Sequence, residues 1–163
     1  GGHFTFGQDI DTQAWQRRFA TIAAAAQELG PVVLACHNAT EASLAAELFP
    51  TYERFQVPND PVAFMEFYSG ARLAVVNRVH AGFMLASLGK PVAVIGSDSR
   101  ARMINLLDLP AYYVNDVPDA HDLLGQLVAH ENSYPARIEA IRSSARARYL
   151  ELLKPVLQPL LSA

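Results

Sequence analysis

Short apolar runs alternate with helix-forming stretches along almost the whole chain, and this alternation limits the possible folds more than any other feature. Three runs are continuous rather than alternating in polarity: "PVVLAC" at 31–36, "RLAVVN" at 72–77 and "PVAVI" at 91–95. Continuous apolar runs of this length are typical of parallel strands buried on both faces. Shorter candidate strands occupy 3–6, 53–57 and 112–114.

The segments between these runs carry signals of helix starts and ends. Asn38 stands three residues before Glu41, the spacing of a capping box, and Asp60 is followed by Pro61. Helices are expected over 11–29, 39–48, 61 onward, 79–88, near 100–108, after 116 and over 134–153, with Pro155 and Pro159 breaking up the tail. This order predicts a doubly wound parallel sheet (Rossmann-like) in a single α/β domain over 1–163.

Length and charge restrict the class of protein. The 163 residues suit one domain, and a formal charge of -3 is not typical of a general nucleic-acid binder, so no nucleic-acid partner is expected. The single cysteine, Cys36, permits no internal disulfide, and without a signal peptide a reducing, cytoplasmic setting is expected. No apolar run approaches the roughly 20 residues needed to cross a bilayer, so the chain is not expected to be transmembrane.

Polar side chains follow four of the expected strands. In open parallel sheets, ligands bind outside the carboxyl ends of the strands, so these polar groups are expected at one edge. They are His37-Asn38, Arg78 with His80, Gly96–Arg100 and Asn115-Asp116.

Arg78 and His80 flank the point where a buried strand gives way to a helix. A helix N-terminus offers unpaired N–H groups and a partial positive charge, and a guanidinium beside it can grip phosphate or carboxylate. The following "AGFMLASLG" is rich in small residues, so this helix can pack close to the sheet. We therefore predict an anion site here. The simpler alternative is that Arg78 pairs with a carboxylate such as Asp98 and that His80 only caps the helix.

The turn at 97–100 is the second candidate part of the site. Ser97, Asp98 and Ser99 can cap the next helix or bind phosphate, and Arg100 adds positive charge. The alternative is a capped helix with a solvated arginine. His37 is a weaker candidate, for which an ordinary loop histidine is the alternative.

Several common sites have no motif in this sequence. There is no P-loop, no GxGxxG and no HExxH, and the other histidines have no metal-ligand spacing, so no metal is expected. Cys36 is expected to be a core residue rather than a nucleophile. A solvated helix face is expected for Arg137, Arg142, Arg146 and Arg148.

A longer pattern surrounds the arginine and histidine. "ARLAVVNRVHAGFMLASLGKPVAVIGSDSRARMINLLDLP", at 71–110, resembles the signature region of the polysaccharide pyruvyl transferase family. That family shows an apolar strand, R-x-H-A, a small-residue helix, G-x-P, a second apolar strand and a D-x-K-like turn before a helix leading to L-G-L-P. The matching residues are Arg78, His80, Ala81, Gly89, Pro91, Asp98 and Leu109-Pro110, and Arg100 stands where the family commonly has lysine.

The resemblance implies one half of a glycosyltransferase-B-like enzyme, here the C-terminal domain of a longer two-domain protein whose N-terminal domain is missing. The donor would be phosphoenolpyruvate, and the acceptor a glycan or lipid-linked sugar that receives a pyruvate ketal. Arg78 and His80 would be catalytic and would bind the donor, together with Ser97, Asp98, Ser99 and Arg100. No cofactor is implied, and the enzyme would be cytoplasmic or at the inner face of the membrane.

Two other functions fit the same pattern. One is the half-domain of a sugar-nucleotide glycosyltransferase, in which an acidic residue near the last helices, such as Glu131, would hold the ribose. The other is a non-catalytic module that binds an anion or a sugar phosphate.

Overall fold

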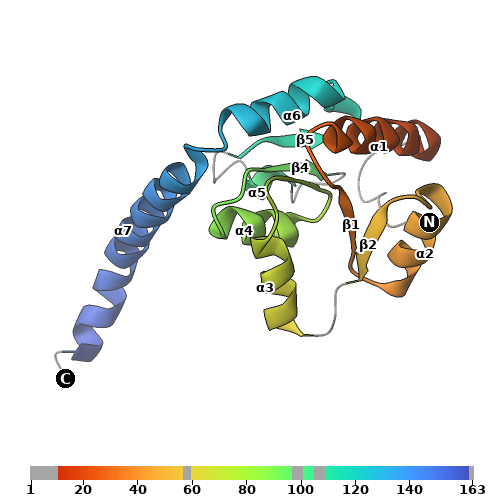
Figure 1. Cartoon of the computed structure of the whole chain (residues 1–163). Helices are drawn as coiled ribbons and strands as arrows, with labels where there is room; N and C mark the ends of the chain where they lie inside the picture. Colours follow the sequence, from red (N-terminus) through yellow and green to blue (C-terminus); the bar gives the residue numbers. More distant parts are fainter. Residues whose placement is uncertain (1–10, 57–59, 97–100, 105–108, 162–163) are drawn as a thin grey trace.

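The computed structural model describes residues 11–56, 60–96, 101–104 and 109–161 (Figure 1). Its strands are β1 (Val33–Cys36), β2 (Glu53–Gln56), β3 (Ala74–Val76), β4 (Val92–Gly96) and β5 (Ala111–Tyr113). Its helices are α1 (Thr12–Gln27), α2 (Ala39–Leu48), α3 (Pro61–Ser69), α4 (Val79–Ser87), α5 (Ala101–Ile104), α6 (Ala120–Ala129) and α7 (Tyr134–Leu161), with the 3-10 helix η3 (Val114–Asp116) after β5. The predicted α/β class is confirmed.

Every strand pairing within the described residues is parallel. β1 pairs with β2, with Val33 opposite Glu53. β4 lies between β3 and β5 in a second sheet, with Ala74 opposite Val92 and Val94 opposite Ala111. Parallel pairing requires a crossover between consecutive strands, and the helices supply these crossovers. The carboxyl ends of β3, β4 and β5 therefore share one edge.

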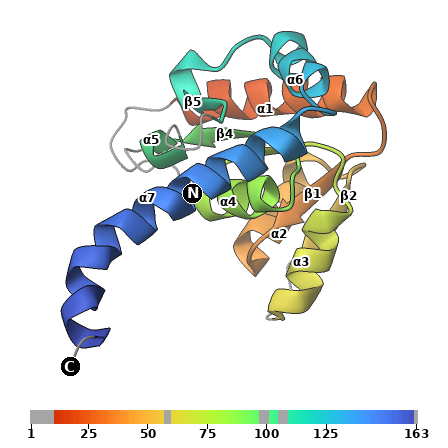
Figure 2. The same ribbon diagram turned by 90° about the vertical axis from the view of Figure 1, so that its left-hand side faces the viewer.

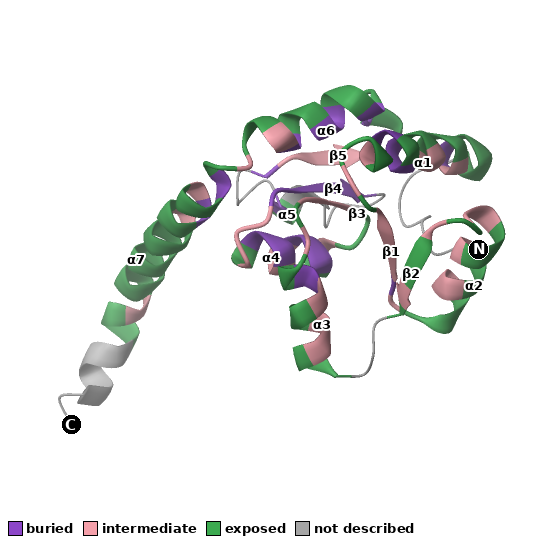
Figure 3. Ribbon diagram, viewed as in Figure 1, coloured by how far each residue is buried: buried purple, intermediate pink, exposed green. Residues whose placement is uncertain are grey.

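β4 forms the centre of the core because both of its faces are covered. Ala93 and Ile95 face the cluster formed mainly by α1 and α6, whereas Val92 and Val94 face the cluster that includes α4 and the first turns of α7. All five β4 residues are buried (Figure 3). A strand buried on both faces needs apolar side chains at consecutive positions, which explains the continuous run in the sequence.

Gly82 sets the distance between α4 and the sheet. A Cβ atom built at Gly82 would lie 2.5 Å from Cγ2 of Val94, closer than real Cβ contacts allow. The glycine therefore lets the helix backbone approach β4, as predicted from the small residues of this segment. α4 begins directly after β3 and carries Arg78 at its N-cap, so this packing also positions the first turn of α4.

Short polar side chains start several helices. Asn38 caps α2 by accepting a hydrogen bond from the backbone N–H of Glu41, and Asp60 caps α3 by accepting one from Val62. Asp119 caps α6 in the same way. Both of the cap positions predicted for α2 and α3 are confirmed. Caps of this kind each stabilise a helix by about 1 kcal/mol.

α7 packs on the body only through its first turns. Tyr134 and Ile138 are buried in the cluster with α4, and the guanidinium of Arg142 donates to the carbonyl oxygen of Ser87 at the end of α4. Figure 2 shows this part of α7 lying across α4, and Figure 1 shows the rest projecting away from the sheets.

The prediction that the helix ends near residue 153 and that Pro155 and Pro159 break up the tail is wrong, because α7 continues through both prolines to Leu161. A proline inside a helix removes one hydrogen bond and crowds the carbonyl group four residues earlier, and a helix can accommodate this by bending. The surrounding leucines favour helix. The strand expected at 3–6 and the second half of the helix expected near 100–108 lie outside the described residues. Among the helices that are described, none is long and apolar enough to span a membrane.

Candidate functional site

Arg78 and Glu41 join the ends of two strands that belong to different sheets. Arg78 follows β3 and is the N-cap residue of α4, and Glu41 lies in the first turn of α2, just after β1. The Arg78 guanidinium donates to Oε1 of Glu41 and forms an ion pair with it. The sequence predicts that the ends of these strands share an edge, and this contact brings them together.

Glu41 collects hydrogen bonds from three residues. Besides Arg78, the backbone N–H of His37 donates to Oε2 at 2.7 Å and the side-chain amide of Asn38 donates to Oε1 at 3.2 Å. Partial burial alone would raise the pKa of this carboxyl. The hydrogen bonds from Arg78 and from His37, with the charge of Arg78, outweigh burial and lower the pKa of Glu41. Glu41 is therefore an ionised acceptor at neutral pH.

The His37 ring lies between Glu41 and Tyr68. Nδ1 is 3.4 Å from Oε2 of Glu41, and Nε2 is 3.2 Å from the hydroxyl of Tyr68. Because the carboxylate can only accept, the proton belongs on Nδ1, and Nε2 accepts from the Tyr68 hydroxyl. The Phe64 ring packs edge-on against His37 with centroids 5.9 Å apart.

Burial dominates the proton affinities of this pair. Tyr68 is only 3% exposed, and burial raises its pKa to about 12, with smaller opposing effects from Arg78 and Glu41. Burial is also the largest cause that lowers the pKa of His37, followed by the positive charge of Arg78, while Glu41 acts in the opposite direction. Tyr68 is therefore a neutral donor and His37 a neutral ring near pH 7.

Four side chains lie in a row of contacts, in the order Tyr68, His37, Glu41 and Arg78. Of these four, only Arg78 is exposed. The Arg78 side chain is 44% exposed, whereas Tyr68 at the other end is buried. We interpret the three inner groups as positioning residues. They hold the guanidinium at the Glu41 carboxylate, and the Arg78 side chain makes no cap hydrogen bond to the backbone N–H groups that begin α4.

His80 lies in the first turn of α4 and is exposed. No hydrogen bond joins its ring to another described residue. Arg78 and His80 are two positions apart across the start of the helix, so both border the same exposed N-terminus. This placement can hold an anion by charge, by backbone N–H groups and by an imidazole.

The other predicted site residues divide into two groups. Ser97, Asp98, Ser99 and Arg100 lie outside the described residues. Asn115 and Asp116 form part of η3 after β5, across β4 from the end of β3. The simpler alternative was that Arg78 pairs with a carboxylate, for example Asp98. Arg78 does pair with a carboxylate, and within the described residues this partner is Glu41.

Cys36 and Glu131, the other two residues weighed as functional groups, both have roles inside the fold. Cys36 is buried, and burial is the largest cause of its raised pKa, which suits a core thiol. Arg72 donates through Nε and Nη2 to both carboxylate oxygens of Glu131, each at 2.8 Å. Glu131 is therefore occupied by an arginine.

Sequence reasoning missed Glu41 and Tyr68 as parts of the site. The sequence identifies Glu41 only as a member of a capping box, and it does not single out Tyr68 as a site residue. The usable signal for Glu41 was its place in the first turn after β1, at the edge where Arg78 was expected. Tyr68 lies 31 residues from His37 in the chain, and no local pattern joins them.

The described residues contain no group of three or more His, Cys, Asp or Glu side chains that could hold a metal ion. In comparisons with known proteins, no family model, no curated protein and no solved structure matches this chain.

The neutral state of His37 predicts a pH-dependent stability. Because folding lowers the pKa of His37, the unfolded chain binds its proton more readily, and the free energy of unfolding falls as the pH drops below about 6.5. The loss grows until the pH reaches the folded pKa. Glu41 has a lowered pKa, so its own contribution is lost only at more acidic pH. Urea unfolding of the wild type and His37→Gln across this range should show the slope in the wild type alone. An equal slope in both proteins would contradict this assignment.

Proposed function

We propose that the edge formed by Arg78 and His80 binds phosphoenolpyruvate, and that the chain is the donor-binding half of a pyruvyl transferase. The observation that carries the proposal is the half-exposed guanidinium of Arg78 at the N-cap of α4, held by Glu41, with the exposed His80 two positions later in the first turn. The order of residues from 71 to 110, which resembles the pyruvyl transferase signature, supports the choice of donor.

The charges of this edge suit a donor with a phosphate and a carboxylate. A guanidinium can give two parallel hydrogen bonds to either group, and the N-terminus of α4 adds backbone donors and a partial positive charge. Glu41 neutralises part of the charge of Arg78 while no ligand is bound. An incoming dianion would either share the guanidinium with the Glu41 carboxylate or displace that carboxylate. Glu41 therefore competes with the anion for Arg78 and lowers the affinity of the site.

The transfer needs few groups from the protein. A proton goes to the methylene carbon of phosphoenolpyruvate, a sugar hydroxyl oxygen bonds to the adjacent carbon and loses its proton, and the bond from that carbon to the phosphate oxygen breaks. The oxygen of a second sugar hydroxyl then bonds to the same carbon, and its proton goes to the released phosphate, which completes the ketal. In this scheme His80 donates the first proton and Arg78 offsets the charge of the departing phosphate. The enolpyruvyl group supplies the reactivity, so no cofactor is required.

The proposal extends to the architecture. In a doubly wound domain the two described sheets would belong to one sheet in the order β2-β1-β3-β4-β5. The all-parallel pairing supports this order, as does the Arg78–Glu41 contact between the ends of β3 and β1. We place this domain as the C-terminal half of a glycosyltransferase-B-like enzyme, whose N-terminal half would bind the glycan or lipid-linked acceptor. A cytoplasmic site of action, at or near the inner membrane face, suits such an acceptor.

A calorimetric titration of the 163-residue chain with phosphoenolpyruvate, inorganic phosphate and a uridine diphosphate sugar tests the donor. We expect saturable binding of phosphoenolpyruvate that is tighter than binding of phosphate, because the carboxylate adds a second anionic contact. Binding of the nucleotide sugar alone would favour the glycosyltransferase alternative, although Arg72 already occupies Glu131, its candidate ribose acceptor. A protein that binds the donor but shows no pyruvyl transfer with its partner domain present would be a binding module.

Glu41→Gln is expected to tighten phosphoenolpyruvate binding, on the order of tenfold, because it removes a negative charge that competes for Arg78. The glutamine keeps one acceptor oxygen, so it can still accept the hydrogen bond from the backbone N–H of His37 but loses the weaker one from the Asn38 amide, which goes to the other carboxylate oxygen. The exposed Glu47→Gln in the same helix removes one charge without contacting Arg78, and it serves as the control. Equal or weaker binding by Glu41→Gln would show that Glu41 does not compete with the ligand.

A further inference from the structure

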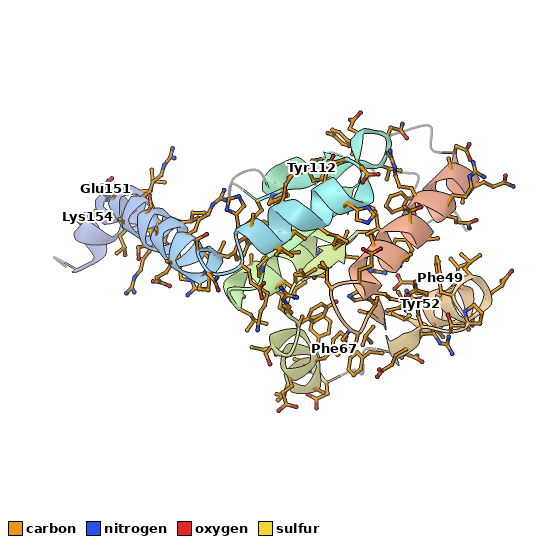
Figure 4. The ribbon with its side chains drawn as sticks, turned by 45° about the horizontal axis from the view of Figure 1, so that its top comes forward. Phe49, Tyr52, Phe67, Tyr112, Glu151 and Lys154 are labelled. Atoms are coloured by element: carbon orange, nitrogen blue, oxygen red, sulfur yellow. The ribbon has the colours of Figure 1, made fainter. Side chains whose placement is uncertain are left out.

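The outer half of α7 presents an apolar stripe that nothing in the described structure covers. Tyr134 and Ile138 pack on the cluster that includes α4. By helical spacing, Tyr149, Leu152 and Val156 lie on the same face of α7, further along the helix. These last three side chains are between 62% and 68% exposed. Figure 4 labels Glu151 and Lys154 on this same part of the helix, well away from the sheets. A row of exposed apolar side chains beyond the edge of the core marks a contact surface.

A matching apolar groove lies between α1 and α6. It has a volume of about 320 Å³, and Leu29 just after α1 lines it together with Leu124 and Val128 of α6. Gly125 also lines it, and a Cβ atom added there would meet no heavy atom within 4 Å. A glycine inside a helix costs stability, so an open glycine facing an apolar groove suits the close approach of another segment.

The charges around the two surfaces are opposite. Residues 134–161 contain five basic and two acidic side chains, for a net charge of +3, whereas residues 1–133 contain eight basic and fourteen acidic ones, for a net charge of −6. At the groove itself, Glu28 lies in the lining, Asp119 lies just before α6 as its N-cap, and Asp122 lies in its first turn. On α7, Arg146, Arg148 and Lys154 accompany the stripe.

We propose that the outer half of α7 docks into the α1–α6 groove of a second copy of this chain. The stripe cannot reach the groove of its own molecule, because α7 is one continuous helix that leads away from the body (Figure 1). Pairing of two α7 helices with each other would bring two net positive segments together. Docking on the acidic body of a second copy instead joins opposite charges and buries both apolar surfaces.

Sedimentation velocity of the 163-residue chain over a micromolar concentration series provides the first measurement. We expect dimers or larger species that dissociate as salt is added, because the charged rim is screened. A wild-type protein that stays monomeric across the series would overturn the proposal. If such a monomer bound vesicles containing phosphatidylglycerol, and Leu152→Gln abolished that binding, the stripe would be a membrane contact instead.

Two variants identify the surfaces. Gly125→Leu fills the groove, fits the open space in the monomer and improves helix propensity, so we expect a folded monomer. Leu152→Gln removes an exposed apolar side chain from the stripe and should also give a folded monomer, as checked by circular dichroism. Val62→Gln, at a similarly exposed residue of α3, is the control and should still associate. Association that persists in Gly125→Leu but not in Leu152→Gln would indicate pairing between α7 helices and would overturn the groove assignment.

Discussion

Gly82→Val is expected to destabilise the protein by about 3 kcal/mol, the upper part of the range for overpacked cores. Even the first added atom would lie 2.5 Å from Cγ2 of Val94, and Val94 is fully buried in the central strand. The added atom would also lie 3.5 Å from Cδ1 of Ile104, which is fully buried too, so neither Val94 nor Ile104 has room to move away. Chemical unfolding monitored by circular dichroism measures the loss. The variant should also weaken ligand binding, because a displaced α4 carries Arg78 with it.

Gly125→Val is the matched control for this prediction. Both glycines lie inside helices, but a Cβ atom at Gly125 has open space around it, so this change should alter stability by less than about 1 kcal/mol. A double-mutant cycle of Gly82→Ala and Val94→Ala tests the contact itself. Removing the valine methyl groups should relieve part of the cost of the alanine. Equal losses for Gly82→Val and Gly125→Val would contradict the close packing of α4 on β4.

Arg78→Ala is expected to abolish most phosphoenolpyruvate binding. Each hydrogen bond to a charged group contributes about 1.5–3 kcal/mol, so losing the guanidinium should weaken the affinity roughly 10- to 100-fold or more. Arg78→Lys keeps the charge but cannot form two parallel hydrogen bonds, so its affinity should fall between those of the wild type and the alanine variant. Isothermal titration calorimetry measures all three.

Arg72→Ala supplies the control for this series. Arg72 is also a partly exposed arginine paired with a glutamate, but its partner is Glu131 and it precedes β3 rather than following it. Its loss should leave phosphoenolpyruvate affinity unchanged. If the two alanine variants weakened binding equally, the effect would come from general surface charge rather than from a site at the start of α4.

Local patterns predicted the α/β class and most of the described helices and strands. The continuous apolar run of β4 and the caps Asn38 and Asp60 depend on near neighbours in the chain, and the elements they mark lie within a few residues of their expected bounds. The end of α7 could not be predicted in this way. Whether a helix stops or bends at Pro155 depends on the balance between one lost hydrogen bond and the helix propensity of its neighbours.

The candidate site was predictable only in its outline. The rule that parallel strands end at one edge brought Arg78 and His37 to the same region. It could not identify Glu41 as the partner of Arg78 or place Tyr68 against His37, because those contacts depend on how α2 and α3 pack across the strand ends. Such packing is set by three-dimensional fit, and residues 31 or 37 positions apart carry no local signal of it.

A titration of the ¹⁵N-labelled chain with phosphoenolpyruvate, followed by amide chemical shifts, tests the central claim most directly. The account predicts saturable shifts centred on the backbone amides of Val79, His80 and Ala81, where α4 begins, and their loss in Arg78→Ala. Shifts centred elsewhere, for example along the α1–α6 groove, or shifts that survive in Arg78→Ala, would contradict it.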